Sequence, residues 1–337
     1  MSGDGPTLSR REALRLSAGL GAGFALGGLP LLTGCAEGEG PALEMEAMEE
    51  TPATPDATPG TRAMITKAIP SSGEELPAIG IGTARRFNVG DSEAERAPLR
   101  EVLRLLPELG GTVVDTAPSY GAAETVIGDL MAELGNRDRI FLATKVRQQD
   151  HDDALAEIER SFQRLRTDRF DLLKIHNLVG WDHKLPVLWE MKAEGRIRYL
   201  GISTSSEGQY ADLAAIMEEE DLDFIQVDYA IDNRSAEERI LPLARDRGMG
   251  VFVNLPFGRG RVFEAFGDQP IPEWAQEFGI QSWAQFALMF VISHPAVTVG
   301  VPGTATPEYV RDNVGTLYGT LPDAATRRRM SDLVDAG

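Results

Sequence analysis

The stretch that decides the fold is DTAPSYG, residues 115–121, because its first residue ends a short apolar run and its other residues begin a polar loop. Two later apolar runs end in the same way, one at Lys145 and one at His176. Apolar runs of this length are typical of buried parallel strands, and in an α/β barrel the chemistry gathers at the carboxyl ends of the strands. We therefore expect Asp115, Tyr120, Lys145 and His176 to meet at the mouth of a barrel.

Strand-like and helix-like segments alternate along residues 63–337, which we expect to form one domain. A small β-hairpin is predicted at residues 65–69 and 75–78, because a Pro-Ser-Ser-Gly turn joins these two runs. No Gly-x-Gly-x-x-Gly turn lies between a strand and a helix, which argues against a doubly wound nucleotide-binding sheet. The pattern predicts an α/β fold, a (β/α)8 TIM barrel that follows the hairpin. Its strands are expected at residues 79–83, 112–114, 140–144, 170–175, 198–202, 224–227, 250–254 and 297–300.

The composition fits one large acidic domain that follows a leader. Of the 337 residues 42% are apolar and 25% are charged, which is enough to build a barrel core of ordinary size. The 33 Lys and Arg residues against 52 Asp and Glu residues give a net charge of −19, so a nucleic-acid partner is not expected. The four histidines lack the spacing of metal ligands, and no metal site is expected. We expect a monomer.

The first 35 residues have the features of an export signal. Residues 9–15 resemble a twin-arginine signature, and the Gly- and Ala-rich run that follows at 16–32 is too short and too interrupted for a stable membrane span. The run ends in Leu-Thr-Gly-Cys, which resembles the cleavage motif after which bacterial lipoproteins are acylated on cysteine. Cys35 is the only cysteine and is the predicted lipidation site. The alternative is that the motif occurs by chance, since a lone cysteine is usually a small buried apolar residue.

Residues 36–62 are rich in Glu, Pro, Thr and Ala, a composition that cannot bury enough apolar surface to offset its ordering entropy. We expect a flexible acidic linker here. The protein is accordingly expected to be exported by the twin-arginine route and to be either a lipid-anchored protein or a periplasmic one. Its only membrane contact would be the lipid on Cys35.

The motif DTAxxYG, followed by a lysine and a histidine at the next two strand ends, resembles the Asp/Tyr/Lys/His tetrad of the aldo-keto reductase family. The resemblance covers roughly residue 64 to the C-terminus, and all four tetrad positions match. It implies an NAD(P)H-dependent oxidoreductase that interconverts an aldehyde or ketone with the corresponding alcohol. Singly, an Asp at a strand end often caps a helix and a loop Tyr often packs, but the joint pattern favours catalysis.

The resemblance assigns a role to each member of the tetrad. Tyr120 would be the general acid, and the ammonium of Lys145 would stabilise its phenolate. Burial tends to strip a lysine of its proton, so Asp115 would keep Lys145 charged. His176 would orient the substrate carbonyl toward Tyr120.

The same resemblance places residues around the nicotinamide. The carboxamide of the ring is held in the family by a Ser-Asn pair and a Gln, which here correspond to Ser203, Thr204 and Gln226. The family then has a stacking aromatic residue before Ser-Pro-Leu-Gly, and the chain has Asn254 at that position, so the ring would stack instead on Phe257 or Tyr229. The segment after Asn254 supplies further predicted cofactor contacts at Leu255, Pro256 and Gly258.

The adenosine end of the cofactor is matched less well. The Lys-Ser pair that grips the 2′-phosphate in the family is replaced by Gly303 and Thr304, and the usual Arg by Tyr309. Asp312 and Asn313 suit the adenine edge. A 2′-phosphate needs cations or the N–H groups of a helix start, which Thr304 and a nearby Arg311 could supply. NADP(H) is therefore the first expectation, and NAD(H) stays open.

The substrate is expected to be a small carbonyl compound that the strand-end loops select. Arg85 and Arg86 could bind an acidic or phosphorylated substrate, although loop arginines are common in soluble proteins. A different class of function also stays open, namely a non-catalytic nucleotide-binding or redox-sensing barrel at the cell envelope.

Overall fold

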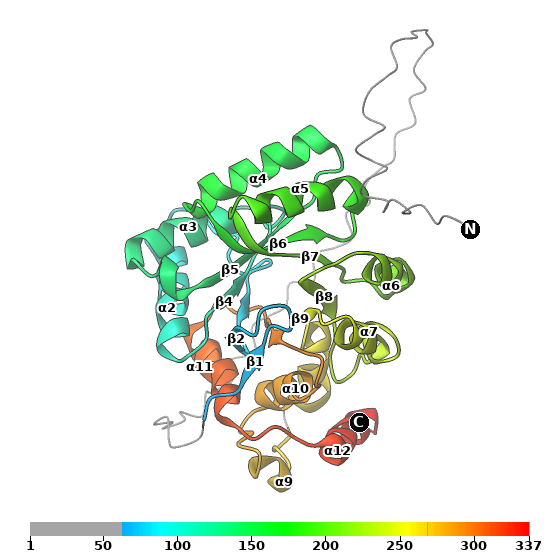
Figure 1. Cartoon of the computed structure of the whole chain (residues 1–337). Helices are drawn as coiled ribbons and strands as arrows, with labels where there is room; N and C mark the ends of the chain where they lie inside the picture. Colours follow the sequence, from blue (N-terminus) through cyan, green and yellow to red (C-terminus); the bar gives the residue numbers. More distant parts are fainter. Residues whose placement is uncertain (1–62, 268, 337) are drawn as a thin grey trace, which may run out of the picture. The chain divides into compact units, whose positions relative to one another are not determined.

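The computed structural model of the chain describes residues 63–267 and 269–336 (Figure 1). The predicted signal peptide, the predicted lipidation site Cys35 and the predicted linker at 36–62 lie outside these residues. Strands β1 (Thr66–Ala68) and β2 (Glu75–Pro77) form an antiparallel hairpin that is separate from the main sheet. The hairpin predicted from the sequence is confirmed.

Eight parallel strands form one sheet in the order β3 to β10, each paired with its sequence neighbour. Two parallel bridges, Ile79 with Gly300 and Gly82 with Gly303, join the first strand to the last and close the barrel. The (β/α)8 barrel is thereby confirmed, because each strand lies within the predicted segment or extends it by one to two residues. The strands are β3 (Ile81–Gly82), β4 (Val113–Asp115), β5 (Phe141–Val146), β6 (Phe170–His176), β7 (Ile197–Ser203), β8 (Phe224–Asp228), β9 (Gly250–Asn254) and β10 (Val299–Gly300).

Helices follow the strands and surround the barrel (Figure 1). One helix follows each strand from β3 to β8, three follow β9 and two follow β10. Their bounds are α2 (Glu93–Glu108), α3 (Ala123–Leu134), α4 (His151–Leu165), α5 (Trp181–Ala193), α6 (Tyr210–Glu219), α7 (Ile240–Asp246), α8 (Arg261–Phe266), α9 (Glu273–Gln276), α10 (Trp283–Ile292), α11 (Pro307–Gly315) and α12 (Ala324–Asp335). Short 3-10 turns stand at residues 137–139, 207–209, 235–237, 258–260 and 316–318.

The barrel interior is built in layers because alternate residues of a strand point to the same face. The lower layers form an apolar cluster that includes Phe141, Phe224 and Phe252, and the hairpin adds Ile69 and Leu76 to it. We call this cluster the floor plug. Above it, each of the strands β4 to β9 carries a polar residue that faces the interior. The polar layer above the floor plug contains Asp115, Lys145, Lys174, Ser203, Gln226 and Asn254.

Phe224 fills the floor plug where two neighbouring strands carry glycine. A Cβ on Gly250 would lie 2.4 Å from the Phe224 ring, and a Cβ on Gly201 would lie 2.4 Å from the Phe224 carbonyl oxygen. Such separations are shorter than non-bonded carbon contacts allow. Glycine at both positions is therefore a packing requirement of the barrel interior.

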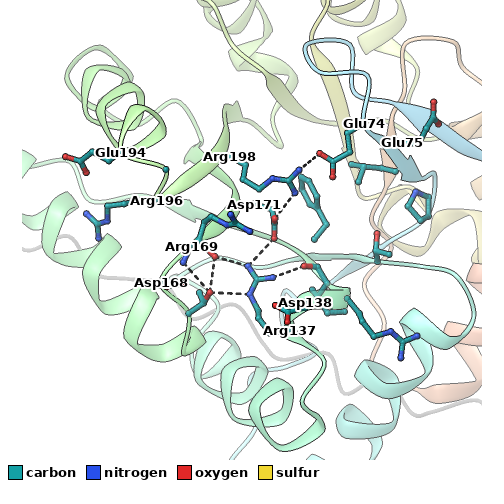
Figure 2. A pocket seen from close by; sticks show the side chains of 18 residues that line it. Glu74, Glu75, Arg137, Asp138, Asp168, Arg169, Asp171, Glu194, Arg196 and Arg198 are labelled. Atoms are coloured by element: carbon teal, nitrogen blue, oxygen red, sulfur yellow. Dashed lines mark hydrogen bonds and ion pairs between the residues drawn. The ribbon is translucent and has the colours of Figure 1, made fainter.

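Below the floor plug, at the amino ends of the strands, the surface has a hollow of about 880 Å³ (Figure 2). Several charged side chains line it, and the central arginines are paired with carboxylates. Arg137 and Arg198 both bind Asp171, at 3.1 and 2.9 Å, and Arg198 also binds Glu74. This network lies at the opposite end of the barrel from the carboxyl ends of the strands, and it ties the β1–β2 hairpin to β6 and β7.

We expect Gly128→Ala to destabilise the protein because α3 packs closely on α4 at this point. An added Cβ would lie 2.0 Å from the carbonyl oxygen of Arg164, so the two helices would have to separate. Overpacking of this kind costs about 1–3 kcal/mol. Chemical denaturation should show that loss of unfolding free energy, whereas Gly208→Ala, whose Cβ would meet only a distant serine oxygen at 3.6 Å, should stay near the parent value. Equal stability of the two variants would contradict the close packing of α3 on α4.

Candidate active site

Three adjacent strands carry the charged members of the predicted tetrad. Asp115 is the last residue of β4, Lys145 lies near the end of β5, and His176 is the last residue of β6. Parallel pairing places Asp115 opposite Ala143, Lys145 opposite Lys174 and His176 opposite Ser203. Tyr120 comes from the loop between β4 and α3, and the structure brings all four side chains together.

The side-chain contacts form a chain from the carboxylate to the phenol. Lys145 Nζ donates to Asp115 Oδ2 at 2.8 Å and to the Thr116 carbonyl oxygen at 2.9 Å. It also lies 3.4 Å from the Tyr120 hydroxyl and 5.2 Å from the centre of the Tyr120 ring. The ring of His176 meets that of Tyr120 edge to face, with the ring centres 6.1 Å apart. The phenol and the imidazole therefore border the same space.

Burial and charge act in opposite directions on Asp115 and Lys145. Both side chains are nearly inaccessible, with 5% and 3% of their surface exposed. Burial alone would raise the pKa of Asp115, but Lys145 and Lys174, followed by the Gln226 amide, hold it well below its usual range. Burial would lower the pKa of Lys145, whereas Asp115 and then Tyr120 raise it. The pair is ionised, and Lys145 keeps a full set of proton donors.

His176 is neutral over the ordinary pH range. Burial is the main cause, with the nearby positive charge of Lys145 second, and together they lower the pKa of His176 to about 3. Ser119 Oγ lies 3.5 Å from Nδ1, at the limit of a hydrogen bond. A neutral imidazole can donate through one nitrogen to a carbonyl oxygen and is a weaker acid than an imidazolium. This favours His176 as an orienting group.

The sequence analysis missed Lys174, the residue two positions before His176 on β6. It is fully buried, and its Nζ donates to Asp115 Oδ1 at 2.5 Å. The alternation of side chains along a strand could have predicted Lys174, because a residue two positions from an inward-facing histidine also faces the interior. The run that ends at His176 contains Asp171 and Lys174 among its apolar residues.

Gln226 and Ser203 lie beside the tetrad in the polar layer. Gln226 Nε2 donates to Asp115 Oδ2 at 3.0 Å, while its Oε1 is buried and has no hydrogen-bond partner among the described residues. Ser203 Oγ donates to the Ile175 carbonyl oxygen at 3.1 Å. An unsatisfied buried acceptor is costly. A carboxamide N–H group would satisfy Gln226 Oε1, so this corner fits the amide of a nicotinamide.

Thr204 and Asn254 are held by the polypeptide itself. The Thr204 hydroxyl donates to Gln209 Oε1 at 2.6 Å, which turns it toward the loop after β7. Asn254 Nδ2 lies 3.5 Å from the Thr204 carbonyl oxygen, and its Oδ1 is buried without a partner in the described part of the chain. Asn254 thus offers a second unsatisfied acceptor at the mouth.

The expected stacking role is wrong for one of the two proposed aromatic residues. Tyr229 is fully buried, and its hydroxyl lies between Glu237 and Arg327 on the helical side of the barrel. Phe257 is only partly buried, and its ring centre lies 5.0 Å from that of Phe263. The tyrosine follows β8 directly, but the backbone directs it away from the mouth.

Backbone strain gathers in the loops after the strands. Of the six described non-glycine residues with positive φ, five follow a strand carboxyl end, namely Arg85, Asn177, Leu178, Leu255 and Arg259. Left-handed conformations cost free energy at such residues and are concentrated at functional sites. The segment Leu255, Pro256 and Gly258 belongs to this strained rim.

The segment predicted to bind the adenosine is itself part of the barrel closure, because it is bonded to the first strand. Thr304 N donates to the Gly82 carbonyl oxygen at 3.3 Å, and Asn313 Nδ2 donates to Thr304 Oγ1 at 3.0 Å. Asp312 accepts hydrogen bonds from Ser282 and Gln285 of the α10 region, so its carboxylate is already engaged. A role of Asp312 and Asn313 at the adenine edge stays a prediction.

Two arginines near this segment differ in what surrounds them. Arg311 lies close enough to Glu101 on α2 to help lower the pKa of that carboxyl group. Arg86, in the loop after β3, is exposed, and its Cγ would lie 3.9 Å from a Cβ on Gly303. It has no carboxylate partner within the described residues. Gly303 has no side chain of its own, and Arg86 is a cation beside it.

Neither a membrane span nor a metal cluster is found in the part of the chain that the structure describes. None of its helices is long and apolar enough to cross a membrane. None of its His, Cys, Asp and Glu side chains come together in a group of three that could hold a metal ion.

The structure thus places a Tyr-Lys-Asp-His group at the carboxyl mouth of a parallel barrel, with an unsatisfied amide acceptor beside it. The sequence profile of the Aldo/keto reductase family matches residues 78–328. The chain belongs to the aldo/keto reductase family and is an oxidoreductase.

Individual relatives agree with this membership. The chain is 30% identical over 267 residues to the methylglyoxal reductase YeaE of Escherichia coli, covering 77% of this chain and 92% of that protein. It is 25% identical over 272 residues to an NADH-specific methylglyoxal reductase of the same organism, covering 64% of this chain and 81% of the relative. An aldo/keto reductase of Klebsiella pneumoniae solved with NADP and acetate superposes with a TM-score of 0.67 at 27% identity, covering 77% and 92% of the two chains.

Proposed function

We propose that this protein reduces a small aldehyde or ketone to the alcohol with NAD(P)H, and that Tyr120 is its general acid. The observation that carries the proposal is the contact of Lys145 Nζ with both the Tyr120 hydroxyl and the Asp115 carboxylate. A phenol is a useful proton donor only if its conjugate base is stabilised, and a buried ammonium can provide that stabilisation. A carboxylate behind the ammonium keeps it charged.

The residues of the chain would act as follows. His176, neutral and edge-on to Tyr120, donates a hydrogen bond that fixes the substrate oxygen beside the phenol. As the carbonyl carbon is reduced, Tyr120 gives its hydroxyl proton to that oxygen and Lys145 stabilises the resulting phenolate. The nicotinamide cofactor supplies the hydride when bound. Because the site lies above the floor plug, reactants reach it from the carboxyl mouth.

We propose NADP(H) as the preferred cofactor, with NAD(H) as the competitor. Support comes from the Klebsiella relative that binds NADP and from the unsatisfied Gln226 Oε1, which suits the carboxamide common to both cofactors. The choice between them depends on a cation for the 2′-phosphate. Gly303 supplies none, and exposed Arg86 beside it is the candidate. The NADH-specific relative keeps NAD(H) in the comparison.

We further propose that the protein is exported by the twin-arginine route and anchored through a lipid on Cys35. The support is the order of the motifs in residues 1–35, with two arginines, an apolar run and then the sole cysteine. A segment of low apolar content at 36–62 would separate the anchor from the barrel.

Tyr120→Phe is expected to abolish carbonyl reduction and to leave nucleotide binding unchanged, because it removes only the hydroxyl. The loss in kcat should be about 10²-fold or more. Turnover is measured as NADPH or NADH oxidation with methylglyoxal and a panel of other aldehydes and ketones, and nucleotide binding by fluorescence titration. Parental activity in this variant would refute the general-acid role. If the parent itself binds nucleotide tightly and reduces no member of the panel, the result would favour the alternative, a non-catalytic nucleotide-binding or redox-sensing barrel.

Arg86→Gln is expected to weaken NADPH binding by about tenfold, the scale of one charged hydrogen bond, and to leave NADH binding unchanged. The matched control is Arg239→Gln, which removes an arginine on the outer surface that binds Glu218. Titration of both nucleotides against both variants measures the effect. A preference of the parent for NADH, with no effect of Arg86→Gln, would favour NAD(H) as the cofactor.

Cys35→Ser is expected to move the mature protein from the membrane fraction to the soluble fraction of a bacterial host. Acylation requires the thiol, and the serine cannot replace it. Cell fractionation with antibody detection measures the shift. Continued membrane association of the variant would remove the lipid-anchor proposal while leaving the enzymatic proposal untouched.

A further inference from the structure

Lysine is scarce in this chain, and each lysine is at least partly buried. Of the 33 basic residues only five are lysine, at positions 67, 145, 174, 184 and 192, and none of them is exposed. Arginine supplies nearly all surface cations. Lys174 is the most deeply buried of the five, with no exposed surface. A lysine retained at such a depth calls for a physical reason, because a buried charge is costly unless it is paired.

Among the described residues Lys174 contacts one carboxylate, that of Asp115, which it shares with Lys145. Its Nζ donates to Asp115 Oδ1, whereas Asp115 Oδ2 accepts from Lys145 and Gln226. Below, the Lys174 ammonium lies 4.6 Å from the centre of the Phe252 ring in the floor plug. No second carboxylate contacts either lysine in residues 63–267 and 269–336. Two ammonium groups thus meet one carboxylate behind Tyr120.

The other titratable groups that face this cluster do not balance its charge. His176 from the end of β6 is neutral, and Arg147 from the loop after β5 adds positive charge near His176. Lys145 stays charged because Asp115 and Tyr120 raise its pKa. Burial lowers the pKa of Lys174 to about 7, with Asp115 opposing the shift and Lys145 adding to it. Among these groups Lys174 is the one poised to gain or lose charge near neutral pH.

We propose that Lys174 is a positioning residue for the reduction, which fixes Asp115 from below and, by holding or releasing its proton, sets the charge behind Lys145 and Tyr120. The proposal rests on the proposed role of Tyr120. With Lys174 protonated, the cluster of Asp115 and two lysines carries one uncompensated positive charge. With Lys174 neutral, the cluster is balanced. Lys174 forms no bond to the substrate and passes no proton to it.

The extra charge favours proton transfer from Tyr120. When Tyr120 gives its hydroxyl proton to the substrate oxygen, a phenolate is left in the mouth, and a nearby positive charge stabilises that anion. The reduction is therefore expected to be faster when Lys174 is charged. The advantage should be present below about pH 7 and be lost as the pH rises through the pKa of Lys174.

The test compares kcat/KM for NADPH-dependent methylglyoxal reduction between pH 6 and pH 8.5 in the full-length parent, Lys174→Met and Lys174→Gln. At pH 6 the parent should exceed both variants by about tenfold, the scale of one charge acting across a protein site. At pH 8.5 the three proteins should be nearly equal. Lys174→Arg, which keeps the charge at every pH, should retain the fast rate at both values.

Lys67→Met is the matched control. It removes a different lysine, partly buried on β1 at the opposite end of the barrel, and should follow the parental pH profile. Thermal melting and NADPH fluorescence titration verify that each variant is folded. A parent-to-variant ratio that is the same at pH 6 and pH 8.5 would mean that Lys174 is structural only, and the proposal would be wrong.

A second measurement does not depend on enzyme activity. With only five lysines, ¹³Cε-labelled lysine in the parent gives few NMR signals to follow against pH. One signal, assigned to Lys174 by its absence from Lys174→Met, should titrate between pH 6 and pH 8.5, and the absence of that titration overturns the proposal. Failure of the proposed function is distinguishable, because it would appear as turnover by Tyr120→Phe. Loss of turnover in Tyr120→Phe together with a pH-independent Lys174 ratio would remove the Lys174 proposal alone.

Discussion

The site depends on one carboxylate that is buried inside the barrel. Asp115 is almost inaccessible to solvent, and a lone charge there would be strongly disfavoured. It is tolerated because both of its oxygens are engaged, one by Lys174 and the other by Lys145 and Gln226. The same contacts fix the Lys145 ammonium beside the Tyr120 hydroxyl. Removal of any partner would leave a buried group unsatisfied, so the members of this network position one another.

The barrel itself explains why such a network can form. Eight parallel strands bring their carboxyl ends to one rim, and side chains two residues apart on each strand stack in layers. The floor plug occupies the lower layers, so the polar layer has an apolar floor and is open only toward the rim. Glycine at 201 and 250 makes space for Phe224 in that floor. The polar residues of the site therefore lie directly above a packed apolar core.

Much of this arrangement could be predicted from the sequence. The apolar runs and the residues that end them predict eight strands, the hairpin and the meeting of Asp115, Tyr120, Lys145 and His176, because register follows from strands that end together. The roles of single side chains beyond a strand end were harder to predict. Tyr229 follows β8 as closely as Asp115 ends β4, yet it turns outward to Glu237 and Arg327, contacts that come from distant segments of the chain. Lys174 was missed because its apolar neighbours concealed the alternation.

The hairpin under the barrel has a consequence for solvent exchange. Since Ile69 and Leu76 seal the interior from below, water and protons reach the polar layer by way of the rim. A dinucleotide lying across that rim would slow the exchange of every acidic hydrogen beneath it. The protonation states of the polar layer would then be set before the dinucleotide binds and would be kept while the carbonyl substrate binds. The order in which the two ligands bind would therefore affect which groups are protonated.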